Sequence, residues 1–332
     1  MATPIDRDVL RLADPEATAD AIAAGLRDAV RGFRRRGAVL GLSGGIDSSV
    51  VAALAARAFG PGKVLGVLMP EADSSPDTLR LSRLAADAIG IDTVLEDITD
   101  TLQAVGCYRR RDDAIRKVLP AYGEGWKAKI VLPSVVDSDA FRLFSVVAVD
   151  PEGQEHRARL TAEAYLEVVA ATNFKQRTRK MFEYHHADRL NYVVLGTPNR
   201  LEYDQGFFVK NGDGAADVKP IAHLYKSQVY QLASVLGVPE EIRSRPPTTD
   251  TYAMPQSQEE FYFSLPYDAM DLCLYAVDQG LPPEAITEAL GLSVEQARRV
   301  FDDIAAKRRV ARYLHAAPLL VGDGAAGADR QG

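Results

Sequence analysis

The chain has 332 residues, of which 47% are hydrophobic and 26% charged, as expected of a globular protein that buries a large core. Its 39 basic and 46 acidic residues give a net charge of −7, which argues against a protein that coats nucleic acid or a membrane surface. Its two cysteines cannot form a disulfide framework, and neither a membrane-spanning apolar run nor the core of a signal peptide stands out. We therefore expect a cytoplasmic protein with no nucleic-acid or membrane partner.

The first hundred residues predict strands that alternate with helices. A helix is expected from Asp14-Pro15, a capping residue followed by a proline in the first turn, to Gly37. The elements that follow are, in chain order, a strand over 38–42, a helix from the next glycine turn to Gly60, a strand over 64–69, a polar loop over 70–76, a helix from there through Ile89 and a strand over 93–98. The strands are apolar throughout, which indicates burial on both faces. This pattern predicts an α/β fold, a parallel twisted sheet with helices on both faces.

Residues 107–160 look like an insertion into this pattern. The elements expected after residue 106 are, in chain order, a β-hairpin of 141–149 and 155–160 around the turn Asp150-Pro151-Glu152-Gly153, a helix from about Thr161, another from Phe174 to about Leu190, and a strand over 192–195. The remainder predicts a helical carboxy-terminal extension. We expect one domain over residues 1–320 and a disordered Gly/Ala-rich tail over 321–332.

The segment Ser43-Gly44-Gly45-Ile46-Asp47-Ser48 is the most informative part of the sequence. Two glycines after a buried strand let the backbone turn sharply and bring its N–H groups close to an anion, and the next helix points its positive end at the same place. The segment lacks the Gly-Lys-Ser/Thr ending of the mononucleotide P-loop and the G-x-G-x-x-G of a dinucleotide fold. It therefore predicts a phosphate site of another kind, the alternative being a tight turn without a ligand.

This hexapeptide resembles the pyrophosphate (PP) loop of the N-type ATP pyrophosphatases, a group of synthetases and tRNA-modifying enzymes. The resemblance implies an adenine nucleotide alpha hydrolase-like fold and ATP as co-substrate. Members cleave ATP between its α- and β-phosphates and activate a substrate oxygen as an adenylate. The loop alone leaves the substrate open.

Later segments resemble the NAD synthetase family in order and approximate spacing, over about residues 20–310. These segments are 173–179 (NFKQRTR), 195–202 (LGTPNRLE), 206–214 (GFFVKNGDG), 220–226 (PIAHLYK) and 247–250 (PTTD). The resemblance implies an ammonia-dependent enzyme that converts deamido-NAD, ATP and ammonia to NAD, AMP and pyrophosphate through an acyl-adenylate. It also implies a homodimer.

The resemblance assigns residues to ATP, to a metal ion and to catalysis by position. Those assigned to ATP and its pyrophosphate are Ser43, Gly44, Gly45, Ile46, Asp47, Ser48, Thr197, Lys226 and Thr248. Asp47, Glu202 and Thr248 would surround Mg²⁺, which prefers hard oxygen ligands shared with substrate phosphates. The catalytic candidates are Asp47, Lys226 and Asp213, with Asp213 as the base for ammonium.

Five residues correspond to the surroundings of the pyridine nucleotide, namely Arg177, Tyr184, Phe207, Lys210 and Asp213. An arginine suits a phosphate or carboxylate, and aromatic rings suit a stacked pyridine. Structural interpretations stay open for several positions. Glu202 and Asp213 could be loop surface charges, Lys226 a solvated lysine, Phe207 a core residue and Tyr184 a packing residue on a helix face.

Three features depart from the compact ammonia-using members of the family. They are the insertion at 107–160, the loop Thr197-Pro198-Asn199, and Ala306 before Lys307-Arg308, where those members carry a histidine. The alternative function is therefore a PP-loop adenylating amide synthetase that acts on a different carboxylic acid. A sulfur-transferring tRNA enzyme fits less well, because Cys107 and Cys273 have no catalytic setting and the chain has no basic surface. Fewer than 43 residues precede the loop, so we expect free ammonia or a separate glutaminase chain as the nitrogen source.

Residues 282–297 have the helix, glycine turn and helix spacing of a DNA-reading motif. The second helix, however, carries the acidic residues Glu295, Asp302 and Asp303 beside Arg298 and Arg299. With a net charge of −7, ordinary helix packing is the favoured interpretation.

Overall fold

A computed structural model describes residues 4–132, 144–246, 252, 254, 262–263 and 265–321. Its central sheet has four parallel strands in the order β3-β2-β1-β7. Their bounds are Ala38–Gly41 (β1), Val64–Leu68 (β2), Asp92–Leu95 (β3) and Val193–Val194 (β7). In the central strand, Val39 pairs with Leu65 on one side and with Val194 on the other. The predicted parallel sheet is confirmed.

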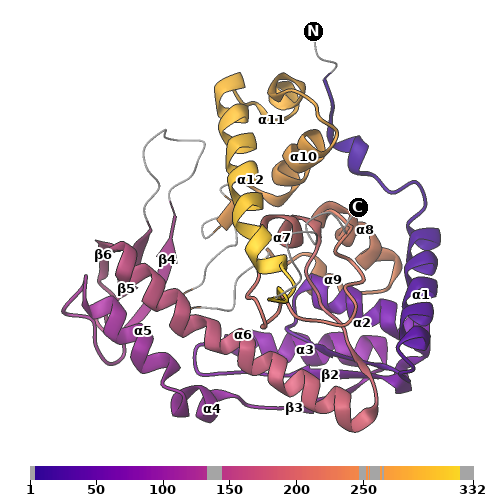
Figure 1. Ribbon diagram of the computed structural model, residues 1–332, viewed down its shortest axis with the longest axis horizontal. Coiled ribbons are helices and arrows are strands. Elements are labelled where there is room, and N and C mark those ends of the chain that lie inside the picture. Colours follow the sequence, from indigo (N-terminus) through magenta and orange to yellow (C-terminus); the bar gives the residue numbers. More distant parts are fainter. Residues whose placement is uncertain are drawn as a thin grey trace.

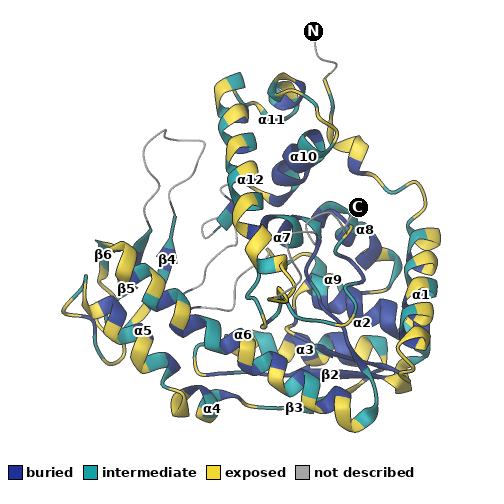
Figure 2. Ribbon diagram, viewed as in Figure 1, coloured by how far each residue is buried: buried dark blue, intermediate teal, exposed yellow. Residues whose placement is uncertain are grey.

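Helices cover both faces of this sheet, as its continuously apolar strands require. On one face, Ala38 and Leu40 share a buried cluster with the helices α1 (Pro15–Gly32), α2 (Ile46–Phe59), α3 (Pro76–Ile89) and α8 (Lys226–Val235). On the other face, Val39 belongs to a cluster with α4 (Thr99–Ala104), α5 (Cys107–Arg116) and α6 (Ala162–Leu190). Figure 2 shows α2 buried and α1 exposed along its outer side. Short 3₁₀ turns lie at Arg7–Leu10 and Pro61–Lys63.

The first helix ends earlier than predicted, at Gly32 rather than Gly37. Arg34 adopts a left-handed conformation with φ of 55°, and the Arg35 N–H donates to the Val30 carbonyl. This is the Schellman arrangement, which satisfies the last carbonyls of a helix and stops it. Glycine is usual at the left-handed position, so an arginine there gave no signal in the sequence.

One continuous helix, α6, replaces the two helices predicted between Thr161 and Leu190. The Thr161 hydroxyl caps its first turn, Asn191 ends it in a left-handed conformation, and no glycine or proline lies between them. Thr172, near the predicted break, donates its hydroxyl back to the Val168 carbonyl, so its polar side chain is satisfied within the helix. With 29 residues, α6 is about 43 Å long.

A second sheet is built from three antiparallel strands in the order β4-β5-β6, and we call it the inserted sheet. Its strands are Lys127–Val131, Ser145–Val149 and Glu155–Arg159. The predicted hairpin is confirmed, with Val149 opposite Glu155, although residues 141–143 lie outside the described part of the chain. Strand β4 was not predicted. The inserted sheet packs on the first half of α6, at one end of the molecule (Figure 1).

The carboxy-terminal part is helical, as predicted, and forms its own buried cluster. Its elements are α7 (Arg200–Gln205), α9 (Glu240–Arg243), α10 (Tyr267–Asp278), a 3₁₀ turn (Pro283–Ile286), α11 (Thr287–Leu290) and α12 (Val294–His315). Ile286 and Ala297, from the helix-turn-helix spacing, are buried against α10. Among the described residues, no helix is long and apolar enough to cross a membrane. Residues 322–332 of the predicted tail lie outside the described residues.

Both cysteine side chains are buried. Cys107 donates its thiol to the Ala171 carbonyl at 3.2 Å, and burial raises its pKa to about 11. A thiol with so high a pKa is a poor nucleophile. Cys273 lies in the core of the carboxy-terminal helices. Both thiols are buried, which agrees with the expectation that neither cysteine has a catalytic setting.

Candidate active site

A cavity of about 1110 Å³ opens at the carboxyl ends of β1 and β2, where parallel sheets usually bind ligands. Its walls come from the turn after β1, the loop after β2, one face of α6, residues 206–213 and the end of α12. The predicted site residues that line it are Ser43, Gly44, Gly45, Ile46, Asp47, Ser48, Arg177, Thr197, Glu202, Phe207, Lys210, Asp213 and Lys226. Thr248 lies outside the described residues. Residues that are far apart in the sequence, between positions 43 and 226, therefore meet in one cavity.

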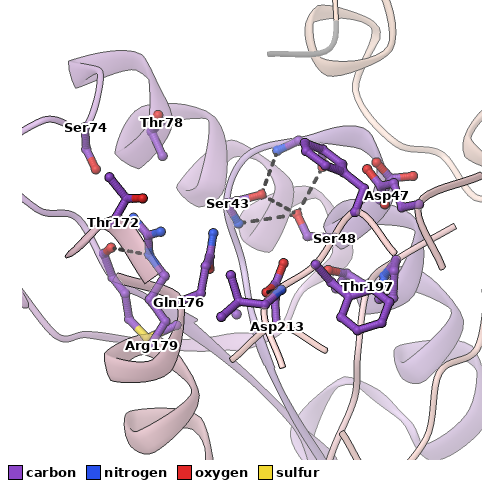
Figure 3. Close-up of a pocket in the computed structure, with 18 of the residues that line it drawn as sticks. Ser43, Asp47, Ser48, Ser74, Thr78, Thr172, Gln176, Arg179, Thr197 and Asp213 are labelled. Carbon is purple, nitrogen blue, oxygen red and sulfur yellow. Dashed lines mark hydrogen bonds between the residues drawn. The ribbon is translucent and has the colours of Figure 1, made fainter. Parts of the chain in front are cut away.

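The turn after β1, which we call the phosphate turn (residues 43–48), is held by its own serines. The Ser48 hydroxyl lies 3.1 Å from the Ser43 hydroxyl and accepts from the Ser43 N–H at 3.3 Å. The Ser49 hydroxyl donates to the Gly45 carbonyl at 2.8 Å. In Figure 3, Ser43 and Ser48 of this turn lie between Thr172, Gln176 and Arg179 on one side and Asp47 and Thr197 on the other. These bonds fix the start of α2 toward the cavity, which suits an anion.

Gly44 is required by the geometry of the turn. Its φ is 72°, and a Cβ there would lie 2.8 Å from the Leu81 Cβ and 2.9 Å from the Thr78 carbonyl oxygen. Gly45 differs, because its φ is −84° and a Cβ would meet only the Ser43 hydroxyl, at 3.4 Å. The first glycine therefore lets the turn lie against α3, while the second leaves its backbone open to the cavity.

Lys226 and Asp47 form an ion pair at the floor of the cavity. Lys226 begins α8 and is only 1% exposed, and its ammonium also lies 5.1 Å from the centre of the Tyr267 ring. Burial alone would lower the pKa of Lys226, but the carboxylates of Asp47 and Glu202 raise it. The lysine is therefore charged, and a solvated surface lysine is ruled out. Asn199 donates its amide to the second Asp47 oxygen at 3.3 Å.

Asp271, which sequence reasoning missed, anchors this lysine. Its two carboxylate oxygens accept the N–H groups of Lys226 (3.2 Å) and Ser227 (2.7 Å), so a side chain of α10 caps the start of α8. Burial raises the pKa of Asp271 to about 6. The only signal in the sequence was an acidic residue among the apolar residues in the middle of α10, whose other two aspartates lie near its ends.

Glu202 lies beside this pair, in the first turn of α7. It forms a capping box with Asn199, in which each side chain accepts the other residue's N–H at 3.2 Å. Burial raises the pKa of Glu202 to about 8, and the nearby Asp47 carboxylate adds to the shift. A cation brought between Asp47 and Glu202 would relieve this repulsion.

The donor set of this site fits Mg²⁺. Asp47 and Glu202 supply carboxylate oxygens, and no cluster of three or more acidic, histidine or cysteine ligands occurs within the described ranges. Two protein carboxylates, with the other positions left to phosphates and water, are typical of Mg²⁺ sites that serve nucleotides.

We expect Glu202→Gln to stabilise the ligand-free protein increasingly as the pH rises from 6 to 9. Because the folded-state pKa, about 8, is above the ordinary 4.5, the folded protein holds a proton that the unfolded chain loses. The free energy of unfolding therefore falls as the pH rises through this window. Glutamine cannot ionise, so it removes this loss of stability, and its side chain still accepts the Asn199 N–H. The gain in the free energy of unfolding over wild type should be larger at pH 9 than at pH 6 by about 1 kcal/mol or more. Thermal unfolding of both proteins in EDTA at pH 6 and pH 9 measures this gain. A stability difference between variant and wild type that is the same at both pH values would contradict the prediction.

Four of the five residues predicted around the pyridine nucleotide line the cavity wall, namely Arg177, Phe207, Lys210 and Asp213. Arg177 donates to the Lys210 carbonyl at 3.3 Å, and Phe207 stacks on Tyr262 with ring centres 4.8 Å apart. The Lys210 ammonium donates to two carbonyls at the end of α12, those of Tyr313 (2.7 Å) and Ala316 (3.0 Å). Lys210 thus caps the last turn of α12 as well as lining the cavity.

Asp213 is half-buried in the same wall. It accepts the Val209 N–H at 2.7 Å, and burial raises its pKa. A carboxylate with a raised pKa suits proton uptake. The interpretation of Asp213 as a free surface charge is therefore not supported.

Tyr184 is not among the described residues that line the cavity. Its hydroxyl donates to Asp217 at 3.3 Å, and Asp217 in turn accepts the Val194 N–H at 2.7 Å. Its ring packs on the sheet face that α6 covers. This geometry fits the packing interpretation, and a contact of Tyr184 with substrate stays a prediction.

A buried network of charges behind the cavity wall was also missed. The Lys175 ammonium donates to Glu71 (2.9 Å) and Asp73 (2.6 Å), Tyr108 donates to Glu71 at 2.8 Å, and Arg111 pairs with Asp73. Burial alone would raise the pKa of Asp73, but Lys175 and Arg111 hold it below its ordinary value. The network ties α5 and α6 to the loop after β2, whose residues 72–76 line the cavity.

We expect Lys175→Met to lower the free energy of unfolding by about 3–5 kcal/mol, because it leaves two buried carboxylates without their shared cation. Lys117→Met is the matched control. Lys117 also pairs with two carboxylates, Glu163 and Glu167, but is well exposed, so its loss should cost less than about 1 kcal/mol. Urea unfolding of both variants compares them, and equal losses would show that burial of the network has no special effect.

Comparison with known proteins shows the family of this chain. The NAD synthase family model matches residues 18–118 and 144–311. The NH(3)-dependent NAD(+) synthetase of Rhizobium meliloti (strain 1021) is 61% identical over 314 residues, which cover 95% of this chain and 94% of that protein. The family match leaves out residues 119–143, which contain β4.

Solved structures share the fold. The NMN synthetase of Francisella tularensis superposes with a TM-score of 0.65 at 21% identity, covering 93% of this chain and 99% of that one. The NH3-dependent NAD synthetase of Campylobacter jejuni, in complex with a nitrate ion, superposes with a TM-score of 0.60 at 21% identity and the same coverage. With a family match over most of its length and a relative at 61% identity, this chain belongs to the NAD synthase family.

Proposed function

We propose that the protein is an ammonia-dependent NAD synthetase, which joins ammonia to the carboxylate of deamido-NAD at the expense of ATP. One observation carries the proposal. The phosphate turn, the Asp47–Lys226 pair and the segment with Arg177 and Asp213 line a single cavity. A site for pyrophosphate thus faces a site for an acid. The family membership and the name of the R. meliloti relative point to the same reaction.

In the first step the substrate carboxylate attacks the α-phosphorus of ATP, and the bond to pyrophosphate breaks. The N–H groups of the phosphate turn and the Lys226 ammonium would stabilise the charge that grows on pyrophosphate. Lys226 is paired with Asp47, and its ammonium would turn from that carboxylate toward phosphate as ATP binds. Asp271 keeps its backbone fixed meanwhile. Arg177 would align the nucleotide that carries the carboxylate.

Asp47 and Glu202 would hold a magnesium ion, with Thr248 as the third group that the family resemblance assigns. Asp47 would then keep a cation beside it when Lys226 turns toward phosphate. Bound there, Mg²⁺ supplies positive charge to the phosphates of ATP.

In the second step ammonia attacks the acyl-adenylate, the C–N bond forms and AMP leaves. Ammonium must lose protons on the way, and Asp213, with its raised pKa, is the candidate acceptor. We place ammonia itself, free or delivered by a separate glutaminase chain, as the nitrogen source. We also propose a cytoplasmic homodimer in which residues 1–320 form one domain.

The acyl-adenylate is tested without ammonia. Incubated with ATP, Mg²⁺ and deamido-NAD, the protein should exchange labelled pyrophosphate into ATP, because the first step is reversible. Exchange should need deamido-NAD and should disappear in Asp47→Ala. Exchange that appears only after ammonium is added would contradict an adenylate formed before amidation.

A further inference from the structure

Helix α10 carries two aspartates on the same face. Asp271 and Asp278 are separated by two helical turns, so they lie about 10 Å apart along one side of the helix. Figure 1 shows α10 beside α7, α8 and α12, and it packs on all three. Asp271 holds the start of α8, which carries Lys226. Asp278, at the end of α10, meets other parts of these helices.

Three donors from three other parts of the chain share the carboxylate of Asp278. Its Oδ2 accepts from the Arg200 guanidinium at 2.6 Å and from the Tyr225 hydroxyl at 3.1 Å. Its Oδ1 accepts from the Arg308 guanidinium at 2.6 Å. The Asp278 side chain is only 13% exposed. Hydrogen bonds between charged groups are strong and directional, so a carboxylate shielded from water in this way holds its donors in a fixed arrangement.

Two of these donors belong to the elements that carry the candidate site. Arg200 is the first residue of α7 and lies two positions before Glu202. Tyr225 directly precedes Lys226 at the start of α8. The Arg200 guanidinium also lies 4.9 Å from the centre of the Tyr225 ring. Asp278 therefore joins the start of α7 to the start of α8.

The third donor, Arg308 of α12, connects the same carboxylate to the far end of α7. Its Nε donates to both carboxylate oxygens of Asp204, at 3.0 and 2.8 Å, while a second nitrogen donates to Asp278. Charged pairs that converge on Asp278 thus hold α7 at its first residue and near its last. A helix of 6 residues is not stable by itself, so these contacts fix where Glu202 lies.

We propose that Asp278 is a positioning residue, which sets the place of Glu202 relative to Lys226 in the cavity. The proposal rests on the proposed function, because it takes these two side chains to act together on the phosphates of ATP. Neither Asp278 nor any of its three donors lines the cavity, so a change at Asp278 removes no contact with substrate. It acts by moving α7 against α8, and a displacement of about 1 Å in a catalytic group lowers a rate by as much as about 10².

Asp278→Asn tests the proposal, because it keeps the shape of the side chain and removes the charge that holds two arginines. In calorimetric titration with pyrophosphate and Mg²⁺, the Kd for pyrophosphate should rise about fivefold or more. Turnover at saturating substrates should fall about tenfold or more. The KM for deamido-NAD should stay within twofold of wild type, since Arg177 lies on α6, outside this network. A protein that is merely destabilised would bind at a lower stoichiometry, with an unchanged Kd.

Tyr225→Phe is the second variant. It removes one hydroxyl from Asp278 and keeps the buried ring, so it stays folded even if Asp278→Asn does not. The Kd for pyrophosphate should rise about threefold, the effect of one hydrogen bond to a charged group.

Asp268→Asn is the matched control. Asp268 lies in the first turn of the same helix and also pairs with an arginine, Arg7, but both side chains are about half exposed. Its loss should leave all these constants unchanged. A Kd for pyrophosphate within twofold of wild type in folded Asp278→Asn would overturn the positioning role, and so would an equal rise in the KM for deamido-NAD. If the unmodified protein binds pyrophosphate but forms no NAD, the proposed function fails instead, so the two failures are distinguishable.

Discussion

Replacing Lys226 by methionine should lower the rate of NAD formation by a factor of about 10³. The ammonium is buried, is held at the floor of the cavity by Asp47 and is the cation proposed to meet the leaving pyrophosphate. Removing one preorganised group of this kind lowers the rate by a factor of about 10²–10³. We expect the loss of a full positive charge to lie at the upper end of this range. Turnover under saturating ATP, deamido-NAD and ammonium measures the effect.

The control for this variant is Lys63→Met. Lys63 is an exposed lysine just before β2, at the opposite edge of the sheet from the cavity, so its loss should leave turnover unchanged. Because Lys226→Met leaves Asp47 without its cation, folding must be checked by circular dichroism before turnover is compared. A folded Lys226→Met protein that keeps more than a tenth of wild-type turnover would contradict the proposed role.

Replacing Gly44 by alanine should destabilise the protein by more than about 2 kcal/mol and abolish ATP binding. The left-handed backbone alone costs a side chain about 1–2 kcal/mol. The new Cβ would also meet the Leu81 Cβ and the Thr78 carbonyl inside van der Waals contact, and that backbone oxygen cannot rotate away. The turn must therefore move off α3, which displaces the N–H groups that face phosphate. Thermal unfolding and calorimetric titration with ATP measure the two effects.

Gly62→Ala is the comparison for this change. A methyl group added at Gly62 would have nothing within 4 Å, and this glycine has no left-handed φ. Alanine there should be neutral or slightly stabilising. If Gly44→Ala unfolds at the same temperature as Gly62→Ala and binds ATP normally, the close approach of the turn to α3 is not needed.

The parts of the fold that the sequence predicted carry local signals. Asp14-Pro15 begins α1, and Gly60 and Gly90 end α2 and α3. The phosphate turn follows an apolar strand. Each of these signals lies within a few residues of the feature that it predicts. Such signals do not depend on the rest of the molecule. They were enough to predict the parallel sheet and the place of the phosphate turn.

The parts that could not be predicted depend on contacts between distant residues. Lys175 meets Glu71 across 104 positions, and Asp271 caps Lys226 from another helix, so neither role is visible in the neighbouring sequence. One helix, α6, stands where two were predicted, and near the predicted break the helix satisfies Thr172 internally through the Val168 carbonyl. Strand β4 was missed because its partner β5 follows only after a long connection.

The proposed reaction is tested most directly by the stoichiometry of its three products. The purified protein is incubated with ATP, Mg²⁺, ammonium and deamido-NAD, and NAD, AMP and pyrophosphate are measured together. We expect one NAD and one AMP for each pyrophosphate, and none of the three with Asp47→Ala. Pyrophosphate without NAD would contradict deamido-NAD as the acid, and would leave an adenylating enzyme that acts on a different carboxylate.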